Sequence, residues 1–507
     1  MTGSPPALSA LEQRLRAVAE VVLEHAPAQT ADIAQDAASL LTSLVALARA
    51  THRPDHAWLL YAAVSGHLPL NDDVEDLVRH LDLARDSTEA EIHVLRCARE
   101  AIDKLGQIDL PVRVVTDAVV VDVTFSAQND MHTGIQRVTR EVCRRWNESH
   151  VITLTAWNSG ESAMRTLVSR EEAKVLAWGG SDPSGPNDGK TRLVVQDGAY
   201  RGPTIVIPWR STVVLPEVTQ GRTSLPLAAL AQHSGNAVVA IGYDAIPVVS
   251  ADVRPPTEPS VYVKYLAVIK HSARVAGISG SAAAEFRGFA DAVRSQGIPG
   301  PQVTGVMLAA EVPGSPVPPV DETPHAPRIL CVGSHEPHKN HLAVLHAAEL
   351  LWRDGLDFEL AFVGGRGWDI SEFDARLNAL IEGGRAVTNL GSVTDDELWS
   401  LYRGAMFTVF PSIHEGFGLP VAESLACGTP AVTTRYGSTG EIAERGGCLL
   451  VDPRDDHDLA AAMHSLLTDG GLYATLKEQA ARSTGRTWDT YATELWSFLV
   501  DGDGHDA

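Results

Sequence analysis

The sequence predicts an α/β protein with two doubly wound domains behind an all-helical N-terminal extension. Three observations support this fold class. Residues 1–108 show helical periodicity throughout, runs rich in β-branched residues alternate with helical patterns from residue 109 onward, and a proline-rich stretch at 311–327 interrupts the alternation. Because strands that alternate with helices form parallel sheets covered on both faces, each half of this region should be one Rossmann-like domain. The length of 507 residues is enough for about three folding units.

The extension, residues 1–108, should consist of helices used for docking or oligomerisation. Apolar residues recur three and four positions apart, which is typical of amphipathic helices. Thr30 and Ser87 precede acidic residues in the manner of helix N-caps. The expected helices cover 7–26, 30–50, 55–66 and 88–106.

Residues 109–315 should form the first doubly wound domain. Short runs rich in valine and isoleucine predict buried strands, and the segments with helical spacing around them predict helices. The expected strands lie in 112–125, 151–157, 191–197, 204–208, 211–216, 236–244 and 274–279, and the expected helices in 133–146, 261–272 and 281–296.

Residues 325–480 should form the second doubly wound domain, and a last helix within 485–500 should pack back on the core. Ligands in such sheets bind beyond the carboxyl ends of the strands, so two facing sheets predict a cleft between the domains. The expected strands lie in 328–334, 358–365, 387–393, 407–412, 429–434 and 447–452, and the expected helices in 341–355, 369–384, 394–405, 420–427 and 456–470.

Composition excludes several classes of protein. The chain has 41 basic and 64 acidic residues, a net charge of −23, which disfavours nucleic-acid binding because such a surface repels phosphate backbones. The cysteines are odd in number and scattered without a CxxC pair, so we expect neither a disulfide framework nor a zinc ribbon. Without a signal-peptide pattern or an apolar run of about 18 residues, we expect a cytoplasmic protein with no transmembrane segment. The cysteines are Cys97, Cys143, Cys331, Cys427 and Cys448.

The stretch 410–434 is the most informative part of the sequence for chemistry. Glu415 follows a predicted strand, and Gly416 and Gly418 permit a close approach of the backbone to a ligand. Pro420 suits the first turn of a helix, which places Glu423 one turn inside it. Loop amides and a helix N-terminus suit an anion, whereas two carboxylates suit the hydroxyl groups of a sugar or ribose. The combination predicts a sugar-nucleotide site.

Glu415 and Glu423 are separated by seven residues, which resembles the E-x7-E signature of retaining glycosyltransferases with the GT-B fold. The C-terminal half resembles glycosyltransferase family four, the group 1 glycosyl transferases, which includes many bacterial mannosyl-, glucosyl- and rhamnosyltransferases. The likeness runs through 328–495, in ILCVGSHEPHKNH, FVGGRGW, LGSVTDDELWSLYRGA, EGFGLPVAE and WDTYA, and TGIQRVTREV and GYDAIPVV in the first domain are similar to the same group. The resemblance implies a GT-B fold in which 109–315 holds the acceptor and 325–480 holds the donor.

The resemblance also implies roles for individual residues. Glu415 would bind hydroxyl groups of the donor sugar, Glu423 would hold the ribose, and Lys339 would neutralise the diphosphate, with Glu415 and Lys339 as the catalytic pair. Gly134 would present amides to the phosphates across the cleft, and Val393 would lie under the base. The EGFGL loop would contact the donor mainly through its backbone, at Gly416, Phe417, Gly418 and Leu419.

Three departures from the family pattern affect the donor pocket. Ser334 stands near the position where many relatives have an arginine, so Arg366 or His338 would have to replace that charge in part. Tyr243 precedes Asp244 where relatives often have a histidine that contacts the sugar, and a tyrosine donates one hydrogen bond without titrating near neutrality. TGIQ has one glycine where the family often has two. His414 and His132 are candidates either for catalytic bases or for hydrogen-bonded structural histidines.

The expected function is that of a retaining glycosyltransferase, which moves a hexose from a GDP- or UDP-linked donor to an unidentified hydroxyl acceptor, such as a glycan, a lipid-linked sugar or a natural product. The TGIQRVTREV likeness favours GDP-mannose. The donor is a substrate, so no cofactor is expected, and without a DxD motif in the expected context no metal is expected either. The alternatives are a non-catalytic sugar-nucleotide-binding or scaffolding protein on the same fold, and a sugar-nucleotide 2-epimerase.

Overall fold

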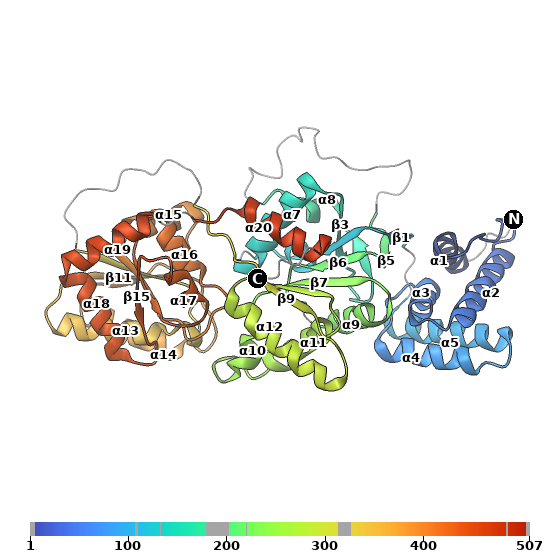
Figure 1. Cartoon of the computed structure of the whole chain (residues 1–507), viewed down its shortest axis with the longest axis horizontal. Coiled ribbons are helices and arrows are strands. Elements are labelled where there is room, and N and C mark those ends of the chain that lie inside the picture. Colours follow the sequence, from blue (N-terminus) through green and yellow to red (C-terminus); the bar gives the residue numbers. More distant parts are fainter. Residues whose placement is uncertain are drawn as a thin grey trace.

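Three bodies follow one another along the long axis of the molecule (Figure 1). The computed structural model describes residues 6–106, 110–131, 133–178, 202–219, 221–312, 326–482 and 485–502. The helical extension lies at one end, the first α/β domain in the middle and the second α/β domain at the other end. The predicted class, two α/β domains behind a helical extension, is confirmed.

The extension is a small helical bundle around Trp58, which is fully buried. The sequence analysis predicts all of its helices except α4, whose apolar stripe is narrow because only Val74, Leu77 and Leu81 are buried. The helices are α1 (Pro6–Val22), α2 (Ile33–Thr51), α3 (Pro54–Ser65), α4 (Asn71–Leu83) and α5 (Ser87–Leu105).

Both predicted N-caps in the extension are wrong by one or two residues. Asp32, not Thr30, caps α2, because its carboxylate accepts hydrogen bonds from the amides of Ala34 and Gln35. Asp86 caps α5, and Ser87 is the first residue of that helix. An aspartate carboxylate is a stronger acceptor for the free amides of a first turn than a neutral hydroxyl.

The sheet of the first domain has the strand order β1-β5-β4-β3-β2-β6-β7-β8-β9. Its strands pair in parallel except β4, which is antiparallel to β3 and to β5. The prediction of a parallel sheet is wrong at β4, because the chain between β3 and β4 is too short for a crossover and turns back as a hairpin. The strands are β1 (Val112–Thr116), β2 (Val119–Asp122), β3 (Ile152–Trp157), β4 (Met164–Thr166), β5 (Ile205–Trp209), β6 (Thr212–Leu215), β7 (Ala237–Gly242), β8 (Arg274–Gly277) and β9 (Gln302–Gly305).

Helices cover both faces of this sheet (Figure 1). They are α6 (Thr124–Gln128), α7 (Gly134–Ser149), α8 (Ser169–Leu176), α9 (Ser224–His233), α10 (Ile246–Val249), α11 (Glu258–Ile269) and α12 (Gly280–Val293), with 3-10 turns η1 (Ala251–Val253) and η2 (Arg294–Gln296). The strand expected at 191–197 and most of the proline-rich stretch lie outside the described residues.

The second domain contains a parallel sheet of strand order β12-β11-β10-β13-β14-β15. Its strands are β10 (Arg328–Val332), β11 (Glu359–Val363), β12 (Val387–Asn389), β13 (Phe407–Phe410), β14 (Ala431–Thr434) and β15 (Cys448–Val451). The helical elements are η3 (Pro337–Lys339), α13 (His341–Arg353), α14 (Ser371–Glu382), α15 (Asp395–Gly404), α16 (Leu419–Ala426), α17 (Gly437–Ala443), α18 (Asp456–Thr468) and α19 (Gly470–Arg482).

The last helix, α20 (Trp488–Trp496), crosses back to the first domain and continues into a π-helical turn, η4 (Ser497–Asp501) (Figure 1). The indole of Trp146 on α7 donates a hydrogen bond to the carbonyl of Ala492 at 2.9 Å, and its ring packs edge-on against Trp496. The end of the chain therefore helps to hold the two α/β domains together. Among the described helices, none has the length and apolar character that crossing a membrane requires.

Candidate functional site

A cavity of about 770 Å³ lies between the two α/β domains. Tyr243 follows β7, Ser334 follows β10 and the Glu415 loop follows β13, so the carboxyl ends of strands from both sheets face this space, as expected for doubly wound domains. The predicted residues that line it are Gly134, Tyr243, Ser334, His338, Lys339, Glu415, Gly416, Phe417, Gly418 and Leu419.

The loop 415–419 forms one wall of the cavity and contacts the opposite domain. A Cβ atom at Gly416 would lie 2.3 Å from the carbonyl oxygen of Tyr243, so only glycine permits this approach. Gly418 has a φ of 102°, which also favours glycine. Ser279, from the first domain, donates a hydrogen bond to the Gly416 carbonyl at 2.7 Å. The loop is therefore held by both domains.

Glu415 and Lys339 form an ion pair on this wall, with Lys339 Nζ 2.6 Å from Glu415 Oε1. Ser412 donates to the same oxygen at 2.7 Å. Burial alone would raise the pKa of Glu415, but the charge of Lys339, the nearby His338 and the hydrogen bonds from Lys339 and Ser412 together lower it, so the carboxylate is ionised at neutral pH. Among the described residues no hydrogen bond reaches Oε2, which leaves one carboxylate oxygen for a ligand.

A second charged group lies beside this pair. Two of its members, Arg254 and Glu336, were not predicted from the sequence. Arg254 donates to Glu336 at 2.6 Å, and Ser334 donates to the other oxygen of Glu336 at 2.7 Å. His338 lies between Glu336 and Glu415, and burial, helped by Lys339, lowers its pKa to about 4, so it is neutral at pH 7. His338 therefore adds no positive charge to the cavity. No sequence signal points to Arg254, because it comes from a short turn in the other domain.

Glu423 is buried and contacts the first domain. Arg137 on α7 donates to one of its oxygens at 2.6 Å, and Tyr402 donates to the other at 3.0 Å. Burial raises the pKa of Glu423, although Arg137 opposes the shift. Glu423 is not among the residues that line the cavity. A carboxylate has about four acceptor positions, so two remain beyond those that Arg137 and Tyr402 occupy.

Tyr243 and His414 both have protein partners. The hydroxyl of Tyr243 donates to the carbonyl of Pro216 at 2.7 Å. His414 Nε2 lies 2.5 Å from the carboxylate of Glu285, and Nδ1 lies 2.8 Å from the hydroxyl of Ser250. Burial would lower the pKa of His414, but Glu285 raises it overall. Of the two roles left open for His414, this geometry supports the structural one, a bridge between the domains.

Two predicted donor residues lie away from the cavity. Arg366 is exposed and pairs with Asp374 at 2.8 Å, and Val393 packs against the hydrophobic core of the second domain. In this arrangement Arg366 does not replace the missing family arginine. His132 lies outside the described residues.

A smaller cavity of about 310 Å³ adjoins the large one, and Val218 and Thr219 line both. Its wall includes Asp122 at the end of β2, and Glu217, which accepts hydrogen bonds from the amides of Phe125 and Ser126. Burial raises the pKa of Glu217 to about 7. The polar groups of this cavity are carboxyls, hydroxyls and side-chain amides, which suit an uncharged ligand rich in hydroxyl groups.

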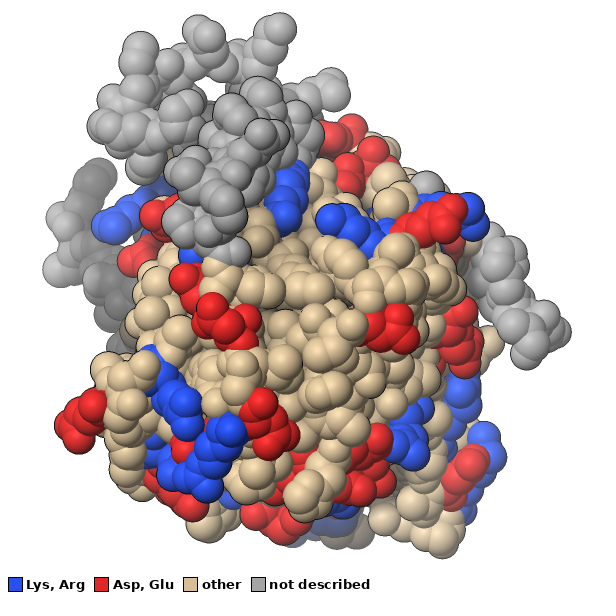
Figure 2. All heavy atoms as spheres, turned by 90° about the vertical axis from the view of Figure 1, so that its left-hand side faces the viewer, with Lys and Arg blue, Asp and Glu red and all other residues tan. Residues whose placement is uncertain are grey.

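Two further features lie away from the cavities: the charged surface of the second domain and a cluster of metal-ligating residues in the extension. Figure 2 views the end of the molecule formed by the second domain, where acidic and basic side chains are interspersed around a mostly uncharged centre, so this face has no broad basic surface. In the described parts of the chain, one group of histidine, cysteine and acidic residues is close enough to hold a metal ion, and it lies in the helical extension.

Residues 320–483 match the family described as "Glycosyl transferases group 1". The chain is 33% identical over 170 residues to the O-antigen chain mannosyltransferase B of Escherichia coli, a match that covers 32% of this chain and 43% of that protein. It is 25% identical over 356 residues to the serotype-specific mannosyltransferase WbdA of the same species, covering 65% of this chain and 39% of that protein. A third relative, the D-inositol 3-phosphate glycosyltransferase of Acidothermus cellulolyticus, is 38% identical over 170 residues, a match that covers 32% of this chain and 38% of that protein.

The chain spans less than half the length of these curated relatives. Among solved structures, that of Anabaena HepE in complex with UDP and glucose superposes with a TM-score of 0.51 at 12% identity, covering 76% of this chain and 100% of that chain. At that identity the match establishes a shared fold.

Proposed function

Because residues 320–483 match the family of group 1 glycosyl transferases, we propose that this chain is a retaining glycosyltransferase that moves a hexose from a nucleoside diphosphate sugar to a hydroxyl acceptor. The observation that carries the proposal is the Lys339–Glu415 pair on the wall of the interdomain cavity. A cation for the diphosphate and a carboxylate for the sugar hydroxyls are the two charged groups that this transfer requires.

In the proposed reaction, the bond from the anomeric carbon to the diphosphate breaks, a bond from that carbon to the acceptor oxygen forms on the same face, and the leaving diphosphate, which gains negative charge, takes up the proton of the acceptor hydroxyl. Lys339 and the amides at the start of α7, near Gly134, would stabilise that charge. The carboxylate of Glu415 would hold the sugar hydroxyls, and Glu423 would hold the ribose. In this scheme Lys339 performs the charge neutralisation that a metal ion performs in other enzymes, so we propose that the transfer is metal-independent.

The contact between the two domains would protect the donor from hydrolysis. Gly416 packs directly on the backbone of Tyr243, and Ser279 ties the same loop to the first domain. A cavity closed in this way excludes water from the sugar.

The acceptor would bind in the smaller cavity of the first domain, next to the donor. Val218 and Thr219 line both cavities, so a hydroxyl group of a ligand in the smaller one can reach the sugar in the larger one. The carboxyl groups of Asp122 and Glu217 on that wall disfavour a phosphorylated acceptor and favour an uncharged polyhydroxyl one.

GDP-mannose is the first donor to test. Two of the relatives are named mannosyltransferases, and the TGIQRVTREV segment is similar to the same group. UDP-linked sugars are the second choice.

The test is transfer of a radiolabelled sugar from GDP-mannose, UDP-glucose and other nucleoside diphosphate sugars to a panel of glycan and small hydroxyl acceptors. The purified chain should use at least one donor, with the anomeric configuration retained in the product. Glu415→Gln should abolish transfer and still bind the nucleoside diphosphate. Glu444→Gln, an exposed glutamate outside both cavities, is the matched control and should keep full activity.

The alternatives give different results in the same assay. A 2-epimerase would convert the donor without an acceptor, and a scaffolding protein would bind donor without turning it over. Protein that binds none of the nucleoside diphosphate sugars, with or without acceptor, would contradict the proposal.

A further inference from the structure

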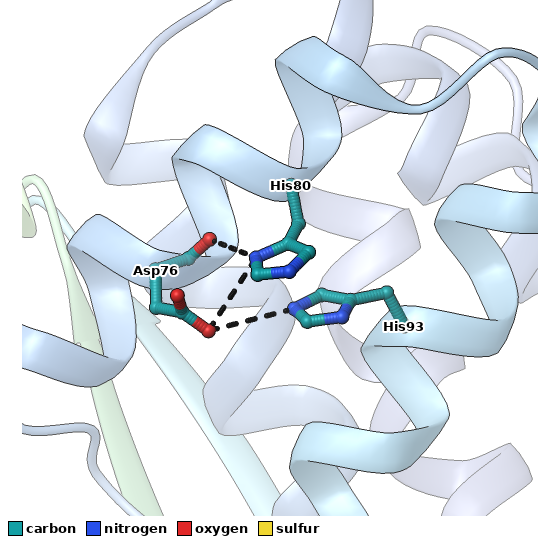
Figure 3. A group of neighbouring side chains, drawn as sticks. All are labelled: Asp76, His80 and His93. Carbon is teal, nitrogen blue, oxygen red and sulfur yellow. Dashed lines mark hydrogen bonds and ion pairs between the residues drawn. The ribbon is translucent and has the colours of Figure 1, made fainter.

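Two helices of the extension present three metal-ligating side chains to one another, those of Asp76, His80 and His93 (Figure 3). Asp76 and His80 are four residues apart on α4, and His93 and Cys97 are four residues apart on α5. Side chains at this spacing lie on the same face of a helix, one turn apart. The pairing of α4 with α5 brings the two faces together.

The donor atoms are separated by distances that suit one small cation. Asp76 Oδ2 lies 3.4 Å from His80 Nδ1 and 3.7 Å from His93 Nε2, and both rings face this one oxygen (Figure 3). The donor atoms of these three residues all lie within 4.8 Å of one another. Tetrahedral zinc with bonds of about 2.0–2.1 Å to nitrogen and oxygen requires donors about 3.4 Å apart.

Cys97 lies next to His93, just outside the group of three, because its Sγ atom is not within 4.8 Å of all the other donor atoms. Its Sγ atom lies 3.4 Å from His93 Nε2, close to the separation of about 3.6 Å that a zinc ion with sulfur and nitrogen ligands requires. The order Asp-x3-His-x12-His-x3-Cys also places two ligand pairs on two consecutive elements, as in structural zinc sites.

The surroundings of the four residues favour a cation. The imidazole rings of His80 and His93 are stacked with centroids 3.5 Å apart, an arrangement that disfavours a positive charge on both rings. His80 Nδ1 lies 2.8 Å from the carbonyl oxygen of Asp76, and a bound metal would replace that hydrogen bond.

We propose that Asp76, His80 and His93, joined by Cys97 once its thiol turns toward them, form a structural site for zinc or a chemically similar transition-metal ion. Imidazole and thiol ligands select such ions over magnesium and calcium, which prefer oxygen ligands. The site lies in the extension and is separate from the proposed glycosyl transfer. It fastens α4 to α5, and because α4 also packs against α9, it stabilises the extension on the first α/β domain.

The decisive measurement is the zinc content of the full-length chain, produced without a polyhistidine tag and dialysed against micromolar free zinc. Mass spectrometry of the metal should find one zinc ion per chain, and zinc should raise the melting temperature. The double variant His80→Ala/His93→Ala should lose both effects. His52→Ala is the matched control, since His52 is an exposed histidine of the same extension that pairs with Asp82, and it should keep both.

Cobalt(II) gives a spectroscopic test that does not depend on stability. The cobalt-loaded chain should show the intense visible absorption of a four-coordinate ion and a thiolate charge-transfer band, and Cys97→Ser should lose only that band. A dialysed wild-type chain with no bound zinc, or a double variant that binds zinc as the wild type does, overturns the site. A cobalt spectrum without the thiolate band overturns the assignment of Cys97. Magnesium should cause no change in melting temperature.

Discussion

Arg137→Ala tests how the two α/β domains are held together at the proposed ribose carboxylate. Arg137 lies on α7 of the first domain and pairs with Glu423 of the second at 2.6 Å, and the side chain of Glu423 is only 7% exposed. Removing one partner from a buried ion pair costs about 3–5 kcal/mol, because the remaining charge loses its compensation. Arg137 is 23% exposed, and Tyr402 would still donate a hydrogen bond to Glu423. We therefore expect Arg137→Ala to lower the free energy of unfolding by about 2–3 kcal/mol at pH 8.

The loss should depend on pH in a defined direction. Burial already raises the pKa of Glu423 in the folded protein, and Arg137 is the main group that opposes this shift. Without Arg137 the folded-state pKa rises further, and an acid whose folded pKa exceeds its unfolded pKa is destabilising only at pH values above the unfolded one. The deficit of Arg137→Ala relative to wild type should therefore shrink as the pH falls from 8 to 5, because a protonated Glu423 needs no cation.

Unfolding by urea, followed by tryptophan fluorescence at both pH values, measures this deficit. Arg144→Ala is the matched control, since Arg144 lies on the same helix, is 48% exposed and pairs with Glu141, whose side chain is 30% exposed. An exposed pair contributes about 1 kcal/mol or less, and its loss should be nearly independent of pH in this range. An Arg137→Ala deficit that equals the control, or that is the same at pH 5 and pH 8, would refute the reasoning.

Three further predictions concern the two cavities. Lys339→Ala should lower kcat by about 10²–10³-fold by removing the cation that faces the leaving diphosphate, as measured by steady-state transfer; a loss under about tenfold would count against that role. Gly416→Ala should lower the melting temperature and raise the donor KM, because the new Cβ would lie 2.3 Å from the Tyr243 carbonyl, whereas Gly404→Ala has open space and should change neither. Burial raises the pKa of Glu217 to about 7 from an ordinary 4.5, so ionisation of Glu217 should cost the folded state roughly 3 kcal/mol between pH 4.5 and 7, and the difference in urea stability between the wild type and Glu217→Gln should change by about that amount over this range.

The sequence predicts which residues of the second domain line the large cavity, because the information for their position is local. Glu415 and Lys339 each follow a strand in a short motif, and parallel strands place the residues after them at one edge of a sheet. The same argument brings Ser334 and the glycine loop to the cavity. Local patterns also predict most of the helices and strands, except short ones such as β4 and helices with a narrow apolar stripe such as α4.

Contacts between distant segments could not be predicted in this way. Arg137 and Glu423 are 286 positions apart, and Arg254 and Glu336 are 82 apart, so both pairs depend on how the two domains face each other. The periodicity of apolar residues within one helix specifies which side chains share a face, but it does not specify which other element packs against that face. For the same reason the pairing of α4 with α5, which creates the proposed metal site, was visible only in the structure.

The charges of the large cavity suggest how Lys339 and Glu415 would act together under the proposed function. Arg254 and Lys339 are the lysine and arginine residues that line it, and both already pair with carboxylates, Arg254 with Glu336 and Lys339 with Glu415. Under the proposed function, a diphosphate competes with Glu415 for Lys339, because the lysine donates three hydrogen bonds from one charge. As Lys339 turns toward the diphosphate, Glu415 Oε1 loses its cation and becomes available, with Oε2, to the sugar hydroxyls. Binding of the diphosphate thereby prepares the carboxylate for the sugar, which couples recognition of the two parts of the donor.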